Sequence, residues 1–155
     1  MGLFLILLAA GDSTRLKSKI PKPFHIVNDK TLLEHSFNAF KDLHKIKRTV
    51  IVYNKKHKKY LNKLNLKRTL KIIGGKTRQE STFIALKKIK KMNCKKVLIH
   101  DSARPNPSKD LINKIIYNLV NNHAVVPVIK INDATKRVEK NVIFKNIQRN
   151  SLRFS

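Results

Sequence analysis

Three short segments combine small residues with cations at spacings that suit the binding of a phosphorylated ligand. They read "AAGDSTR" followed by "PKPF" (residues 9–24), "GGKTRQES" (74–81) and "DSARP" (101–105). Small residues let backbone N–H groups approach a ligand closely, and arginine or lysine can bind phosphate oxygens. Together the segments predict a phosphate-binding site.

Each segment by itself also has a purely structural interpretation. The first contains neither the Gly-x-Gly-x-x-Gly of dinucleotide folds nor the Gly-Lys-Ser/Thr of a P-loop, so it could be a tight turn with solvated cations. The second could be a glycine turn before a helix capped by Thr77, with Glu80 as the capping-box partner. In the third, Asp101 or Ser102 could cap a turn beside Arg104. Their occurrence together, each after a predicted strand, favours a site.

The elements that must position these segments alternate along the chain. Helical patterns lie between near-continuous apolar runs, which are typical of strands buried on both faces. The apolar runs are 3–8, 49–53, 70–73, 96–100 and 124–131, and the helical patterns are 31–43, 55–64, 78–92 and 108–122. In 78–92 we expect Phe83, Leu86 and Ile89 to face the sheet. The alternation predicts an α/β fold, a three-layer α/β/α sandwich with a mostly parallel, Rossmann-like sheet.

The pattern changes after about residue 131. Residues 131–149 predict a polar β-hairpin that projects as an arm, with no helix after it. In an open parallel sheet ligands bind at the carboxyl ends of the strands, where the three segments fall. We therefore expect one domain over 1–155, incomplete at its C-terminus because no closing helix or strand follows the arm.

Composition limits the classes of partner. The formal charge of +26 suits nucleic acid, an anionic membrane or small phosphorylated ligands, but the lysines are spread along the chain as a codon-biased, AT-rich genome would place them. The single cysteine excludes an internal disulfide and a multi-cysteine metal site. The apolar start is too short to cross a membrane and lacks a basic leader, so we expect a cytoplasmic protein without a membrane partner.

The segments "LAAGDSTRLKSKIPKPF", "GGKTRQES" and "LIHDSARP", in this order and spacing, resemble the 2-C-methyl-D-erythritol 4-phosphate cytidylyltransferases of non-mevalonate isoprenoid synthesis. The resemblance implies transfer of CMP from CTP to the polyol phosphate, with release of pyrophosphate and Mg²⁺ as cofactor. It also implies an N-terminal fragment, because family members continue beyond the last residue of this chain.

The resemblance assigns nucleotide contacts to eight residues of the three segments: Ala9, Ala10, Gly11, Gly74, Gly75, Ser81, Asp101 and Arg104. Backbone groups of the first loop would wrap CTP, and the glycine pair with its serine would contact the cytosine and ribose side. Asp101 would bind Mg²⁺ or the ribose.

The resemblance further implies catalytic roles for Arg15, Lys22 and Arg149. Arg15 and Lys22 would neutralise the triphosphate and the transition state. Substrate contacts would come from the arm, through Asp133, Thr135 and Arg149. Family members form homodimers through this arm, so Arg149 of one chain would approach the site containing Lys22 of the other.

Three positions depart from the family pattern. Ser13 stands where a second glycine is usual, which we expect to be tolerated if its φ stays below zero. Lys76 replaces an aspartate, so that contact to the base must be absent or made by backbone. Ala134 stands where a threonine is expected and Thr135 follows it.

The sequence is also compatible with other functions. A ribitol 5-phosphate cytidylyltransferase would share the nucleotide site and differ in its acceptor. A basic nucleic-acid-binding module is disfavoured, because the aromatic residues do not interleave with the basic ones as a stacking platform requires. The sequence does not decide whether the complete protein carries a cyclodiphosphate synthase domain downstream.

Overall fold

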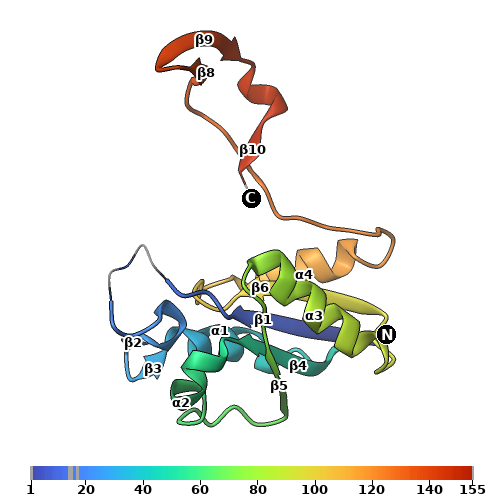
Figure 1. The fold of residues 1–155 in the computed structure, drawn as a ribbon. Coiled ribbons are helices and arrows are strands. Elements are labelled where there is room, and N and C mark those ends of the chain that lie inside the picture. Colours follow the sequence, from blue (N-terminus) through green and yellow to red (C-terminus); the bar gives the residue numbers. More distant parts are fainter. Residues whose placement is uncertain (1, 14–15, 17, 155) are drawn as a thin grey trace. The chain divides into compact units, whose positions relative to one another are not determined.

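The computed structural model describes residues 2–13, 16 and 18–154. The chain divides into two compact units, Met1–Lys109 and Asp110–Ser155, and each is treated by itself below. Figure 1 shows the elements of both units.

A four-stranded parallel sheet forms the centre of the first unit. Its strand order is β5-β4-β1-β6, with β1 (Leu3–Ala9), β4 (Ile46–Tyr53), β5 (Thr69–Ile73) and β6 (Lys96–Asp101). Every residue of β1 is buried, because the strand has a neighbour on each side and helices on both faces. This burial explains why the sequence of β1 is a continuous apolar run rather than an alternating one.

Helix α3 (Arg78–Lys90) covers one face of this sheet (Figure 1). Its buried side chains lie four residues apart, at Ser81, Ala85 and Ile89. The predicted stripe is confirmed at Leu86 and Ile89, which pack on the core, and wrong at Phe83, which is 64% exposed, while the smaller Ala85 faces the strands. The apolar cluster beneath the helix joins Ala85 and Ile89 to alternate residues of the two central strands, namely Phe4, Ile6, Leu8, Val50 and Val52.

Helix α1 (Leu32–Lys41) covers the opposite face. The Phe40 ring lies 5.2 Å from the His100 ring, measured between centroids. His100 pairs in register with Leu7 of β1, and Leu7 points away from the face that α3 covers, because side chains alternate along a strand. Helices on both faces of a parallel sheet confirm the predicted three-layer α/β/α sandwich.

Short elements join the strands and the larger helices of the first unit. Thr31 caps α1 through a capping box with Glu34. The remaining elements are a 3-10 turn η2 (Lys22–Phe24), the hairpin of β2 (Ile26–Val27) with β3 (Lys30–Thr31), a second 3-10 turn η3 (Lys55–His57) and helix α2 (Lys58–Leu61).

The second unit contains the predicted hairpin. Strands β8 (Thr135–Glu139) and β9 (Val142–Ile147) pair antiparallel around a two-residue turn. Both turn residues, Lys140 and Asn141, have positive φ values, 46° and 65°, as the favoured tight hairpin turns require. The unit also contains α4 (Lys109–Asn118), β7 (Ile129–Lys130), the 3-10 turn η4 (Arg149–Ser151) and β10 (Arg153–Phe154).

Three predicted elements differ from the structure. The helix predicted over 55–64 is a 3-10 turn, Lys55–His57, followed by a short helix that ends at Leu61. Of the run 124–131, only Ile129–Lys130 forms a strand, and this strand pairs antiparallel with β10 instead of joining the central sheet. Pro127 explains part of the difference, since it cannot donate a ladder hydrogen bond. The helix predicted over 108–122 ends at Asn118, before a polar Asn121-Asn122 pair that favours a turn. No helix in the described part of the chain is long and apolar enough to cross a membrane.

Candidate functional site

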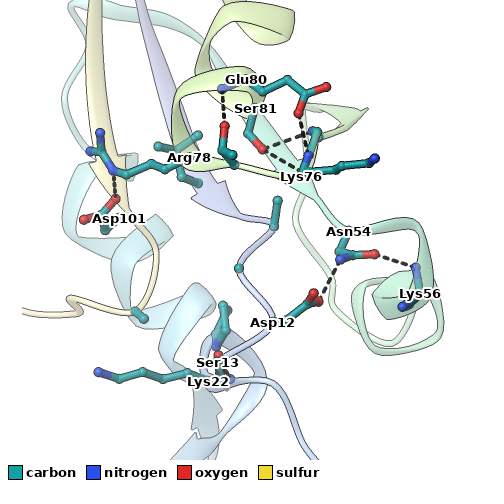
Figure 2. A pocket seen from close by; sticks show the side chains of 18 of the residues that line it. Asp12, Ser13, Lys22, Asn54, Lys56, Lys76, Arg78, Glu80, Ser81 and Asp101 are labelled. Carbon is teal, nitrogen blue, oxygen red and sulfur yellow. Dashed lines mark hydrogen bonds and ion pairs between the residues drawn. The ribbon is translucent and has the colours of Figure 1, made fainter. Parts of the chain in front are cut away.

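The carboxyl ends of the central strands open into a cavity of about 920 Å³ (Figure 2). The loops after β1, β4, β5 and β6 supply its walls, so all three predicted segments meet here. Cations outnumber carboxylates in the lining: the acids are Asp12, Glu80 and Asp101, and the cations are Lys22, Lys55, Lys56, Lys76, Arg78 and Arg104. A cavity with this balance of charge attracts an anionic ligand.

The loop after β1 exposes its backbone to the cavity. A Cβ added at Gly11 would meet no atom within 4 Å among the described residues beyond its two chain neighbours, which leaves room there for a ligand. Ser13 has a φ of 55°, which contradicts the expectation that its φ stays negative. This left-handed conformation aims the Ser13 Oγ at the backbone N–H of Lys22, which donates to it at 2.8 Å. The hydrogen bond holds Lys22 at the cavity.

Asp12 connects this loop to the turn after β4. Its Oδ1 accepts a hydrogen bond from Asn54 Nδ2 at 2.8 Å and lies 3.6 Å from His57 Nε2. Burial lowers the pKa of His57 from its ordinary value of 6.5, Asp12 opposes this shift, and Lys56 adds to it. Asn54 and His57 lie outside the three motif segments, and no pattern in the sequence marks them as site residues.

The glycine pair after β5 is required by close packing. A Cβ at Gly74 would lie 2.7 Å from Ser81 Oγ and 2.8 Å from the Cβ of Ala10, and a Cβ at Gly75 would overlap the Glu80 side chain. Ser81 is buried, and its Oγ accepts a hydrogen bond from Gly75 N–H at 3.1 Å. Ser81 therefore holds the glycine turn in place at the cavity wall.

The helix cap that follows is only partly the predicted one. Thr77 Oγ1 accepts a hydrogen bond from Glu80 N–H at 3.0 Å, as a capping residue does. The Glu80 carboxylate accepts instead from the backbone N–H of Lys76 at 2.7 Å, one residue before the cap. Glu80 thereby fixes the backbone of Lys76, whose side chain lies at the cavity (Figure 2).

Two guanidinium groups flank the carboxylate of Asp101. Arg78 Nε donates to its Oδ1 at 3.0 Å, and Arg104 Nε lies 3.6 Å from its Oδ2. The ion pair with Arg104 confirms the structural interpretation of the third segment, whereas Arg78 was missed. Its only signal in the sequence was its position at the start of a helix after the glycine pair.

Ser102 fastens the third segment to the sheet. This buried residue donates from its Oγ to the carbonyl oxygen of Leu8 at 2.6 Å and accepts at its own carbonyl from Ser36 Oγ at 2.8 Å. His100 Nε2 lies 2.7 Å from the Arg104 carbonyl oxygen, and burial lowers the His100 pKa. The loop that presents Asp101 is thus held by buried hydrogen bonds.

Most of the predicted nucleotide-site residues gather at this cavity. Its lining includes Ala10, Gly11, Lys22, Gly74, Gly75, Ser81, Asp101 and Arg104. Ala9 is fully buried at the end of β1 and is not among the described lining residues. Arg15 lies outside the residues that the structure describes.

The predicted acceptor residues belong to the second unit. Arg149 Nη1 donates to the Asn132 carbonyl oxygen at 2.8 Å, and Thr135 Oγ1 donates to the Asp133 carbonyl oxygen at 3.4 Å. Both hydrogen bonds order the base of the hairpin. The roles predicted for Asp133, Thr135 and Arg149 stay predictions.

The cavity carboxylates suit one mode of magnesium binding. No group of three or more His, Cys, Asp or Glu side chains that could hold a metal ion occurs among residues 2–13, 16 and 18–154. Asp12, Glu80 and Asp101 each already accept a hydrogen bond or ion pair from a protein donor. Mg²⁺ commonly binds through one or two carboxylates together with substrate phosphates. These residues fit an ion that arrives with a nucleotide, rather than a protein cage.

The chain is similar to proteins of one enzyme family. A family model described as "IspD: 2-C-methyl-D-erythritol 4-phosphate cytidylyltransferase" matches residues 3–155. The "Bifunctional enzyme IspD/IspF" of Pelagibacter ubique is 44% identical over 98% of this chain. The "2-C-methyl-D-erythritol 4-phosphate cytidylyltransferase" of Wigglesworthia glossinidia brevipalpis is 36% identical over 97% of it.

Solved structures agree with this similarity. The bifunctional IspDF from Campylobacter jejuni matches 99% of this chain and 39% of its own, with a TM-score of 0.83 and 29% identity. The Francisella tularensis 2-C-methyl-D-erythritol 4-phosphate cytidylyltransferase matches 99% of this chain and 69% of its own, with a TM-score of 0.79 and 25% identity. The chain spans 41% of the length of the Pelagibacter ubique protein and 66% of the length of the Wigglesworthia glossinidia brevipalpis protein.

Proposed function

The chain belongs to the 2-C-methyl-D-erythritol 4-phosphate cytidylyltransferase family, and we propose that it transfers CMP from CTP to that polyol phosphate and releases pyrophosphate. The observation that carries the proposal is the meeting of three glycine- and cation-bearing loops at one cavity. The family match over residues 3–155 supports the same activity.

The reaction needs charge neutralisation more than acid or base catalysis. A phosphate oxygen of the acceptor attacks the α-phosphorus of CTP, a P–O bond to it forms, and the bond to the pyrophosphate oxygen breaks. The attacking oxygen is already ionised at neutral pH, so the protein must align two anions and reduce their repulsion. Lys22 does this from the loop after β1, and Arg15 is proposed to assist it. The backbone at Gly11 lies beside the triphosphate.

The glycine pair and Asp101 hold the nucleoside end. The backbone of Gly74 and Gly75, held by close packing against Ser81 and Glu80, would contact the base side of the nucleotide. Arg78 and Arg104 hold the Asp101 carboxylate in one orientation, which suits it to accept a hydrogen bond from a ribose hydroxyl. Magnesium, when bound, would neutralise part of the triphosphate charge, with Asp101 the carboxylate best placed among the predicted residues to approach it.

The acceptor half of the site is proposed to come from the arm. Asp133, Thr135 and Arg149 would contact the polyol phosphate, and the arm would join two chains into a homodimer. A two-stranded hairpin is marginally stable in water by itself, which supports a protein partner for β8 and β9. Light scattering on the full-length protein, with and without residues 132–148, tests this: the deletion should yield a monomer.

Pyrophosphate release identifies the reaction. The full-length gene product is incubated with CTP, Mg²⁺ and a panel of polyol phosphates, and the expected result is release with methylerythritol phosphate. Preference for ribitol 5-phosphate would replace the acceptor and keep the nucleotide site. No release with any acceptor would overturn the proposal.

Two further predictions of the sequence analysis stay with this proposal. DNA binding should be weak and collapse with added salt, since association through spread lysines depends on counterion release. The enzyme is proposed to act in the cytoplasm, where its charged small-molecule substrates would be found.

A further inference from the structure

Asn54 joins two walls of the cavity with the two ends of one side-chain amide. Its Nδ2 donates to Asp12 Oδ1 at 2.8 Å, and its Oδ1 accepts from the backbone N–H of Lys56 at 3.0 Å (Figure 2). A carboxylate can only accept from the amide nitrogen, and an N–H can only donate to the amide oxygen, so the two partners fix its orientation. The loop after β1 and the turn after β4 are thereby fastened together.

The loop after β1 depends on such a fastening. A Cβ at Gly11 would meet none of the described residues beyond its chain neighbours within 4 Å, and Ser13 holds a φ of 55°, which is unfavourable for a residue with a side chain. Between them, the Asp12 carboxylate is 56% exposed and is tied to the protein by Asn54, with His57 Nε2 at 3.6 Å. If the Asn54 donor is lost, the strained segment keeps the hydrogen bond from Lys22 N–H to Ser13 Oγ but loses the one that links it to the turn after β4.

The neighbouring strands bring these two segments together. Tyr53, the last residue of β4, pairs in register with Ala9, the last residue of β1. Asn54 therefore starts its turn at the same level of the sheet at which the loop after β1 begins. The same turn carries Lys55 and Lys56 into the cavity lining.

We propose that Asn54 is a positioning residue for the nucleotide. Through Asp12 it holds the Gly11–Ser13 backbone in the geometry that receives the phosphates. Through Lys56 N–H it positions the turn that carries Lys55 and Lys56 against the same ligand. The inference rests on the proposed function, because the ligand of this loop is a nucleoside triphosphate. Asn54 acts through its neighbours and does not itself contact the reacting atoms.

Helix capping alone does not explain an asparagine here. Asn54 caps η3 with its oxygen, and aspartate serves equally well as a capping residue. The amide nitrogen is used only for Asp12 among the described hydrogen bonds. An Asn54→Asp substitution therefore keeps the cap and removes the link, and it places two carboxylates against each other.

The test measures nucleotide affinity by calorimetry on the full-length protein, with CTP and ATP as probes in the presence of Mg²⁺. Asn54→Asp should weaken binding of the preferred triphosphate by about tenfold or more, because a hydrogen bond to a charged group is lost and like charges are brought together. Its melting temperature should stay close to that of the wild type, because the Asp12 carboxylate is more than half exposed. A purely structural role would lower the melting temperature instead.

Exchanging the side chains of Asp12 and Asn54 should restore the nucleotide affinity that Asn54→Asp loses. In the double variant Asp12→Asn with Asn54→Asp, the hydrogen bond runs in the opposite direction and the cap on Lys56 N–H is retained. Affinity should return to within about threefold of the wild type, since the two sites are directly coupled. Asn62→Asp, at an exposed position after α2 and outside the cavity lining, is the matched control for the added charge and should bind as the wild type does.

The outcomes separate this inference from the proposed function. Unchanged affinity in Asn54→Asp, or a double variant that binds as weakly as the single one, overturns the positioning role. A wild type that prefers ATP contradicts the proposed cytidylyl transfer, and the Asn54 series then tests the positioning role with ATP. A wild type that binds neither triphosphate overturns both.

Discussion

The Arg78 guanidinium donates to the Asp101 carboxylate at 3.0 Å, which links the first residue of α3 to the last residue of β6 across the mouth of the cavity. Neither residue needs the other for folding, because Arg78 is 64% exposed and exposed ion pairs contribute about 0–1 kcal/mol. The contact instead fixes the orientation of a carboxylate at the cavity.

Arg78→Gln is therefore expected to separate binding from stability. The free energy of unfolding should change by less than about 1 kcal/mol, while the affinity for CTP should fall because Asp101 loses its orienting partner. Urea unfolding and calorimetry measure the two quantities. Lys87→Gln, on the exposed side of the same helix, is the control for lost charge. Unaltered CTP affinity in Arg78→Gln would show that Asp101 needs no such support.

Lys22→Ala should remove most of the activity while the fold is retained. Lys22 is exposed at the cavity, so its side chain contributes little to the core, and loss of one preorganised charge costs on the order of 10²–10³-fold in rate. Steady-state pyrophosphate release measures the effect, with Lys71→Ala, an exposed lysine of β5, as control. A Lys22→Ala enzyme with a near-normal rate would contradict the phosphate-binding role of this loop.

Gly74→Ala should lower the stability of the protein, whereas Gly11→Ala should lower its affinity for CTP. The new methyl group at residue 74 would lie 2.7 Å from Ser81 Oγ and 2.8 Å from Ala10 Cβ, and such overpacking costs about 1–3 kcal/mol of unfolding free energy. At Gly11 the new methyl group would meet no described residue beyond its chain neighbours within 4 Å, so stability should be retained and CTP binding should weaken. Thermal unfolding and calorimetry on both variants provide the comparison. Equal destabilisation of the two would contradict it.

Two substitutions at Ser13 separate its strain from its hydrogen bond. Both Ser13→Ala and Ser13→Gly remove the acceptor of Lys22 N–H, but only alanine keeps a Cβ at a φ of 55°. The glycine variant should therefore be more stable than the alanine variant by about 1–2 kcal/mol. Urea unfolding measures the difference. A glycine variant no more stable than the alanine variant would mean that the loop does not hold this conformation in solution.

His57 should make the protein less stable in mild acid. Burial lowers its folded pKa below the ordinary 6.5, so as the pH falls through about 6.5 the unfolded chain takes up a proton that the folded chain does not. The unfolded state then binds more protons, and the free energy of unfolding decreases. His57→Gln should lose less stability than the wild type between about pH 7.5 and pH 5.5, whereas the exposed His123→Gln should follow the wild type. Parallel curves for His57→Gln and wild type would contradict this assignment.

Much of the fold was predictable because buried parallel strands are apolar throughout. The runs that became β1, β4, β5 and β6 carry this signal, and the glycine pair and "DSARP" follow two of them. The run 124–131 carried a similar signal and was misleading, because apolar content alone does not exclude a segment whose Pro127 interrupts the ladder.

The site was less predictable than the fold where contacts join distant segments. The φ of Ser13 depends on a hydrogen bond from Lys22, nine residues away, and the orientation of Asp101 depends on Arg78, twenty-three residues before it. Asn54 belongs to none of the motif segments, and its role arises only because β4 lies beside β1. Local patterns identify loops, and the tertiary fold determines which side chains meet.

The central place of β1 has a consequence for how the chain is made. In the sequence β1 comes before the two strands that flank it in the finished sheet, β4 and β6, so one of its edges has no partner until Asp101 has been synthesised. During that time "LFLILLA" is an apolar segment with a free strand edge, which is the kind of segment that drives aggregation. The dense lysines of the following hundred or so residues would keep neighbouring nascent chains apart by charge repulsion. Replacing exposed lysines far from the cavity with glutamine should then lower the yield of folded protein without altering the finished fold.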